Sequence, residues 1–159
     1  MSVARWLPLA LIWIGSAAGA ELPEALPGWV IEPTGHNYAE LVERVDAAVA
    51  KSPLNVVTRA SATVGAKSLG QKIPGNIVVG VFAPQFAIRL LDASVAAGIE
   101  APLRLYITEN TDGTATLSYK TASHVFAPYA EGGQELSALA TELDTTLQQV
   151  AEQATRQQD

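Results

Sequence analysis

The sequence predicts an α+β fold in two layers, in which helices pack on one face of an antiparallel sheet in the order β-α-β-β-α-β-β-α. Three observations predict it. Residues 103–109 and 115–119 alternate between apolar and polar side chains on either side of a turn, which is typical of a β-hairpin. Residues 77–82 form a continuous apolar run, which is typical of an internal strand. Apolar side chains recur at helical spacing over 37–50 and again after residue 133.

The N-terminal elements follow from local signals. Residues 28–33 form a short first strand after a Pro-containing lead-in. Asn37 and Glu40 match an N-cap pair, so the first helix begins there and continues to about residue 50. Pro53 ends this helix, because proline lacks the N–H that an α-helix needs.

The middle of the chain alternates between strands and helices. A strand begins near residue 54, and residues 62–70 form a helical piece that ends at Gly70. After the apolar strand, Pro84 occupies a first helical turn, and we expect this next helix to end at Gly98. We expect its buried face to comprise Phe86, Ala87, Leu90, Leu91 and Ser94.

The C-terminal part contains the hairpin and one long helix. Residues 110–113 (Asn-Thr-Asp-Gly) have the composition of a turn. The long helix follows Gly132 and Gly133, and we expect residues 153–159 to fray. Its apolar positions are Leu136, Leu139, Leu143, Leu147, Val150 and Ala154.

Composition excludes several classes of function. The 159 residues include 10 Lys and Arg against 16 Asp and Glu, and the net charge of −6 argues against nucleic-acid binding. The chain has no cysteine, which excludes disulfides, thiolate zinc sites, iron–sulfur clusters and covalent c-type haem. A hydrophobic content of 48% is that of a folded protein.

Residues 1–20 have the three parts of a secretory signal peptide. Arg5 supplies the positive charge, residues 6–15 are apolar, and a small-residue A-x-A pattern ends at Ala20. We therefore expect cleavage after Ala20. An uncleaved anchor is the alternative, but a membrane span needs about twenty apolar residues and this stretch is shorter.

The expected cleavage site and the start of the first helix divide the chain into three parts. Residues 1–20 are the signal peptide, residues 21–36 are the lead-in and first strand, and residues 37–155 are a single α+β domain. We expect the mature protein in a bacterial periplasm, with no stable insertion in the membrane after cleavage.

The hairpin carries the candidate binding residues. Arg104 and Tyr106 share one face of their strand, because side chains alternate with a period of two. An arginine beside aromatic rings binds carboxylate or phosphate groups in bidentate fashion. We expect Arg104, Tyr106 and Tyr119 to line a ligand surface. The alternative is structural: Arg104 pairs with Glu109 or with an acid of the C-terminal helix and holds the two layers together.

The two histidines are His36 and His124, and their spacing matches no metal motif. His36 precedes the first helix in a Gly-His-Asn segment and is expected to be solvated or to cap that helix. His124 follows the hairpin, where an imidazole is able to act as an axial haem ligand, so we keep it as a candidate ligand-binding residue. We expect neither a metal nor another cofactor. The alternative function is that of a haem- or metal-binding redox accessory protein that uses His124.

A hydrolase is a third hypothesis. Residues 66–70 (Ala-Lys-Ser-Leu-Gly) resemble a nucleophile elbow around Ser68, and His124 is the histidine that follows it in the chain. The elbow requires a strand, a sharp turn and then a helix, whereas Ser68 belongs to an expected helical segment. We expect no catalytic residues.

Several segments together resemble one known family. They are VGVFAP at 79–84, AIRLL at 87–91, APLRLYITE at 101–109, Asp112-Gly113 and LSY at 117–119. Ala66 and Gly70 also look like the family's Ala-x-x-x-Gly segment. In these features the chain resembles the domain of unknown function 302 family, with the TT-1751-like fold. The looser similarity covers residues 38–152.

The resemblance implies a compact α+β domain that tends to form homodimers and is often exported, and it implies no established common activity. Many members carry an Asp-His pair four residues before the Ala that matches Ala66, where this chain has Ser61 and Ala62. We therefore expect a homodimeric periplasmic protein that binds a small ligand or a periplasmic protein partner.

Overall fold

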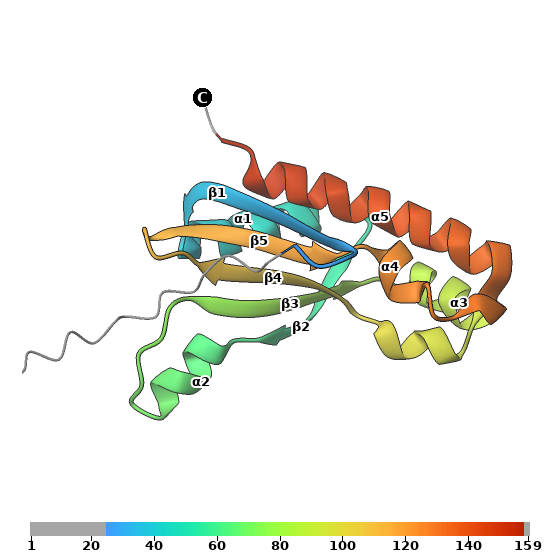
Figure 1. Ribbon diagram of the computed structural model, residues 1–159, viewed down its shortest axis with the longest axis horizontal. Helices are drawn as coiled ribbons and strands as arrows, with labels where there is room; N and C mark the ends of the chain where they lie inside the picture. The colour runs from blue at the N-terminus through green and yellow to red at the C-terminus, as the bar shows by residue number, and fades with distance from the viewer. Residues whose placement is uncertain (1–24, 158–159) are drawn as a thin grey trace, which may run out of the picture.

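The computed structural model describes residues 25–157, so the expected signal peptide and cleavage site lie outside the described residues. Five antiparallel strands form one sheet in the order β1-β5-β4-β3-β2 (Figure 1). The strands are β1 (Trp29–Asn37), β2 (Asn55–Ala60), β3 (Asn76–Phe82), β4 (Leu103–Glu109) and β5 (Thr114–Lys120). The α-helices are α1 (Tyr38–Ala50), α2 (Ala62–Ser68), α3 (Pro84–Ala93), α4 (Ala122–Phe126) and α5 (Gly133–Thr155), with short 3₁₀ helices η1 (Ala96–Glu100) and η2 (Ala130–Gly132).

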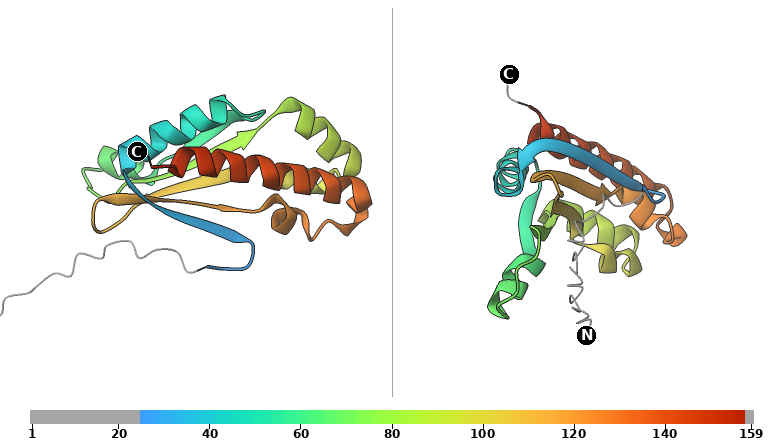
Figure 2. Two further views of the ribbon diagram at one scale, coloured as in Figure 1. Left: turned by 90° about the horizontal axis from the view of Figure 1, so that it is seen from above. Right: turned by 60° about the vertical axis from the view of Figure 1, so that its left-hand side comes forward.

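The α+β fold class and the order of the main elements are confirmed. Helices α1 and α5 lie against one face of the sheet, and α3 continues this helical layer at one end (Figure 2). The strands contribute alternate side chains to the core, such as Leu103, Leu105 and Ile107 of β4, which are fully or almost fully buried. Burial of this apolar surface is the main force that holds the two layers together.

Local signals placed several element boundaries correctly. The Asn37 side chain accepts a hydrogen bond from the Glu40 backbone N–H at 3.0 Å and caps α1. Gly113 adopts a φ of +83° in the β4–β5 turn, and Gly70 a φ of +72° after α2, which are conformations that glycine adopts without strain. Pro84 lies in the first turn of α3.

The expected end of α3 at Gly98 is wrong. The helix ends at Ala93, because Ser94 is extended and its side chain accepts a hydrogen bond from the Ala97 N–H at 3.1 Å. That bond starts the 3₁₀ helix η1, which contains Gly98. The expected buried face was also too wide, since Leu91 is exposed.

The described part of the C-terminal tail, residues 153–157, is more regular than expected. Helix α5 continues to Thr155, and the Arg156 carbonyl accepts a hydrogen bond from the Arg44 guanidinium at 2.5 Å. The first strand is also longer than residues 28–33, because it pairs with β5 as far as Asn37 across an irregular register.

Within residues 25–157, no helix is both long enough and apolar enough to cross a membrane.

Candidate ligand-binding groove

The face of the sheet opposite α1 and α5 is here called the open face. Side chains on this face form three rows that run across the strands, as the strand register shows. The first row is Trp29, Lys120, Arg104, Gly80 and Thr58; the second is Ile31, Ser118, Tyr106, Val78 and Ala60; the third is Pro33, Thr116, Thr108 and Asn76. Cations therefore gather at one end of the open face, and hydroxyl and amide groups at the other.

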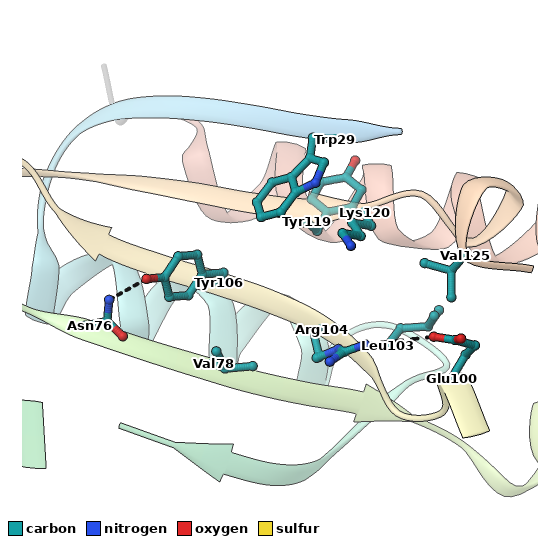
Figure 3. Close-up of a pocket in the computed structure, with 10 residues that line it drawn as sticks. All are labelled: Trp29, Asn76, Val78, Glu100, Leu103, Arg104, Tyr106, Tyr119, Lys120 and Val125. Atoms are coloured by element: carbon teal, nitrogen blue, oxygen red, sulfur yellow. Dashed lines mark hydrogen bonds and ion pairs between the residues drawn. The ribbon is translucent and has the colours of Figure 1, made fainter. Parts of the chain in front are cut away.

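A groove of about 390 Å³ lies on the open face, and we call it the sheet groove (Figure 3). Its lining residues come from β1, β3, β4 and β5 and from the segments that follow α3 and β5. They are Trp29, Asn76, Val78, Glu100, Leu103, Arg104, Tyr106, Tyr119, Lys120 and Val125. This volume falls in the range of about 300–1,000 Å³ that is usual for small-molecule sites.

Two cations define the charged end of the groove. Arg104 of β4 and Lys120 of β5 are neighbours across the two strands, one position beyond the pair Leu105–Tyr119. The carboxylate nearest to the Arg104 guanidinium belongs to Glu100, and its oxygen is 3.9 Å from Nη2, which is too far for a hydrogen bond. The Arg104 side chain remains 63% exposed. Its donors are therefore available to a ligand.

Arginines on the helical side of the sheet are engaged more closely. Arg59 donates to Asp46 at 2.5 Å and Arg89 donates to Glu142 at 2.7 Å. Arg44 donates to the Ala154 carbonyl at 2.6 Å. Arg104 differs from these three arginines, because its cross-strand neighbour is the cation Lys120 and because it makes no hydrogen bond to Glu100.

Aromatic rings form the walls of the groove. The Lys120 ammonium lies 5.7 Å from the centre of the Trp29 ring, which is within cation–π range. At the other end, the Asn76 amide donates a hydrogen bond to the Tyr106 hydroxyl oxygen at 2.5 Å. Since this oxygen accepts in the bond drawn in Figure 3, the Tyr106 hydroxyl keeps a proton that it is able to donate to another acceptor.

Tyr119 touches the groove, but its side chain lies on the other face. It pairs with Leu105, whose side chain is in the core, and it is itself only 4% exposed. Burial raises the pKa of Tyr119 to about 12, and the acids Glu32, Asp144 and Glu152 add to this rise. The structure therefore brings Arg104 and Tyr106 together on the open face and directs the Tyr119 ring towards α5.

Arg104 does not pair with Glu109 or with an acid of α5, as the structural alternative predicted. The Glu109 carboxylate accepts a hydrogen bond from the Gly75 N–H at 2.6 Å, and the α5 acids Glu142 and Asp144 bind Arg89 and Ser123. The Arg104 side chain is on the open face, so it does not reach across the core to the helical layer.

His124 lies beside the groove without lining it. Its backbone N–H is capped by Thr121, and a Cβ on residue 28 would come within 2.0 Å of the His124 ring, so the ring lies against the Gly28 backbone. Its neighbour Val125 lines the groove. Haem ligation by His124 stays a prediction, which a hemin titration with His124→Ala as control would test.

The remaining candidates do not assemble into a catalytic group. The Ser68 hydroxyl donates to the Gly65 carbonyl at 2.7 Å, and its helix α2 is at the opposite end of the molecule from α4, which carries His124 (Figure 1). His36 is buried rather than solvated, and it contacts Glu40 and the Arg156 carbonyl. Among the described residues, no cluster of three or more His, Asp or Glu side chains is placed to hold a metal ion.

Sequence reasoning missed Trp29, Lys120 and Asn76. The signal for Lys120 was present, because the short turn sets the hairpin register and places residue 120 opposite residue 104. The same alternation assigns Tyr119 to the apolar face with Ala115 and Leu117. No local pattern assigns Trp29 to the open face, since its position depends on which strand pairs with β1.

Comparison with known proteins agrees with the fold. Residues 31–154 match the family "Domain of unknown function DUF302". The crystal structure of an uncharacterized conserved DUF302 protein from Bacillus stearothermophilus is similar to the chain, with a TM-score of 0.72 and 17% sequence identity. The similarity covers 82% of this chain and 100% of that one, and at this identity it establishes the fold alone. No curated protein matches the chain. The chain belongs to the DUF302 family.

Proposed function

We propose that the protein is an exported periplasmic binding or accessory protein that holds a small ligand in the sheet groove. One observation carries this proposal: Arg104 and Lys120 stand side by side on the open face, in an aromatic-walled groove, without an acid in hydrogen-bond contact with Arg104. Like charges on neighbouring strands repel each other, and a bound anionic group would remove the repulsion between Arg104 and Lys120. The signal-like residues 1–20 support export.

Native mass spectrometry of the protein, purified gently from the periplasm of its own host, tests this proposal. We expect a chain that begins at Glu21 and carries a small co-purified molecule. Arg104→Ala and Lys120→Ala should lose that molecule, because each removes one of its two cationic partners. Arg89→Ala is the matched control, since Arg89 is also an exposed arginine but faces Glu142 on α5.

Three results would count against the proposal. The first is a protein without any added mass. The second is an added mass that both Arg104→Ala and Lys120→Ala retain, and the third is an added mass that Arg89→Ala also loses. If a protein is found bound in place of a small molecule, the accessory function holds and the ligand is a partner. Circular dichroism of each variant excludes unfolding as the cause of a loss.

We also propose that two copies associate through α2. This helix buries none of its side chains, and it leaves Val64 69% exposed, with Leu69 just after it 79% exposed. It follows the edge strand β2, on which Val57 is also exposed. Such apolar side chains beside an unpaired strand edge favour association with another chain.

A further inference from the structure

We propose that the ligand of the sheet groove is an aromatic monocarboxylate, with its carboxylate between Arg104 and Lys120 and its ring beside Trp29 and Tyr106. This inference rests on the proposed function and adds the chemical class of the ligand. Three features of the groove favour this class of ligand: its net charge, the shape of its donors, and the nature of its walls and far end.

The net charge of the groove favours a single negative charge on the ligand. Arg104 and Lys120 supply two positive charges, and Glu100 supplies one negative charge at the same end. The Glu100 carboxylate is held in place by the Tyr129 hydroxyl, which donates to it at 2.7 Å. The excess is therefore one positive charge. A carboxylate balances it, whereas a phosphate monoester carries about two negative charges and would be repelled by Glu100.

The donors fit a planar anion. The Arg104 guanidinium presents a flat fork that matches the two oxygens of a carboxylate. Lys120 adds a point charge from the neighbouring strand, and its ammonium is directed over the Trp29 ring at 5.7 Å. A carboxylate between these two side chains would contact both cations while its substituent extends along the sheet.

The walls fit a flat apolar body. Trp29 and Tyr106 flank the groove from β1 and β4, and Val78 lies next to Tyr106 on β3 (Figure 3). Aromatic rings that pack in offset-stacked or edge-to-face arrangements are stabilised beyond the area that they bury. The row order places Tyr106 one row away from Arg104, so a ring attached to the carboxylate would lie beside Tyr106.

The far end of the groove offers polar groups. Because the Tyr106 hydroxyl accepts from Asn76, its proton remains available for an acceptor on the ring. This end therefore favours a ring that carries a hydroxyl or carbonyl group.

Isothermal titration of the mature protein with 2-naphthoate, and in parallel with 2-naphthamide, tests the inference. The two probes have nearly the same shape, and only the acid carries a charge. We expect 2-naphthoate to bind and 2-naphthamide to bind at least roughly tenfold more weakly, as for the loss of a charge-assisted hydrogen bond. Quenching of Trp29 fluorescence should follow the same curve, because Trp29 is the tryptophan that remains after cleavage at Ala20.

Variants assign the effect to the groove. Arg104→Ala and Lys120→Ala should each weaken 2-naphthoate binding by roughly tenfold and leave 2-naphthamide unchanged. Arg104→Lys should restore part of the affinity, because it keeps the charge and loses the planar fork. Arg89→Ala should bind both probes like the unchanged protein.

The outcomes separate this inference from the proposed function. Equal binding of acid and amide would overturn the anionic class while leaving a ligand groove in place. Displacement of 2-naphthoate by equimolar inorganic phosphate would replace the carboxylate with a phosphate group. Absence of 2-naphthoate binding at millimolar concentration would overturn the aromatic monocarboxylate, and a co-purified molecule of another class would still support the proposed function.

Discussion

At the scale of single residues, Tyr119 connects the core to the charges of the helical layer. Its ring is buried beneath α5, and burial together with Glu32, Asp144 and Glu152 raises its pKa to about 12. In the unfolded chain a tyrosine ionises near pH 10. The folded protein therefore retains a proton that the unfolded chain loses in this interval.

The sign of the resulting pH dependence follows from linkage. The contribution of Tyr119 to the free energy of unfolding is fully present below pH 10 and decreases as the pH rises towards 12. This loss is about 2 kcal/mol after allowance for partial screening by solvent. Urea unfolding of the protein and of Tyr119→Phe between pH 9 and pH 12 measures this loss. The variant should lose less free energy of unfolding over this interval. An equal loss in both proteins would show that other groups cause it.

Gly80 shows how closely the open face is packed. A Cβ on residue 80 would lie 2.1 Å from the Thr58 hydroxyl and 2.8 Å from Pro102 Cγ. Gly80→Ala should therefore lower the free energy of unfolding by about 1–3 kcal/mol through overpacking, as measured by urea denaturation. Gly65→Ala is the control, since a Cβ on residue 65 meets no atom within 4 Å and alanine favours the helix. A neutral Gly80→Ala would contradict the packing of the first row.

At the scale of elements, the end of α5 depends on the start of α1. Arg44 donates to the Ala154 carbonyl at 2.6 Å and to the Arg156 carbonyl at 2.5 Å, where a helix C-terminus carries a partial negative charge. His36 contacts the same Arg156 carbonyl at 3.2 Å. These contacts explain why the last turn is helical where the sequence predicts fraying.

Arg44→Ala should release this last turn. We expect faster amide hydrogen exchange over residues 152–156 and a loss of about 1 kcal/mol in the free energy of unfolding. Glu43→Ala, on the same helix but exposed, should change neither quantity. Similar exchange in both variants would mean that core packing alone orders the end of α5.

Elements whose signals are local were predicted well. The β4–β5 hairpin follows from alternation and a short turn, and the start of α1 follows from Asn37 and Glu40, which are three residues apart. The end of α3 was missed because it depends on Ser94, whose hydroxyl also donates to Glu131, a residue far along the chain. Contacts of this kind cannot be predicted from local sequence patterns.

At the scale of the whole molecule, the sheet order creates the candidate site. The hairpin alone would place Arg104 beside Lys120, and this pair could have been predicted from the turn. The aromatic wall needs β1 to pair with β5, and the polar far end needs β3 to pair with β4. Since these pairings join distant segments, Trp29 and Asn76 could not be assigned to the site from the sequence.

Association through α2 makes a prediction at the same scale. Leu69→Glu should convert a dimer into a monomer, because it places a charge in the apolar contact. Ile99→Glu is a matched control, since Ile99 is 80% exposed on η1, away from α2. Sedimentation equilibrium measures both variants. A dimer that Leu69→Glu leaves intact, or one that Ile99→Glu dissociates, would place the interface elsewhere.

If the open face of the sheet is the ligand-binding surface, NMR mapping will detect the bound ligand there. Amide spectra of ¹⁵N-labelled mature protein are compared before and after addition of the low-molecular-weight fraction of the host periplasm. We expect shifts around Trp29, Arg104, Tyr106 and Lys120, with the exposed surfaces of α1 and α5 unchanged. Shifts concentrated on those helices, or a bound molecule that leaves the groove amides unmoved, would contradict it.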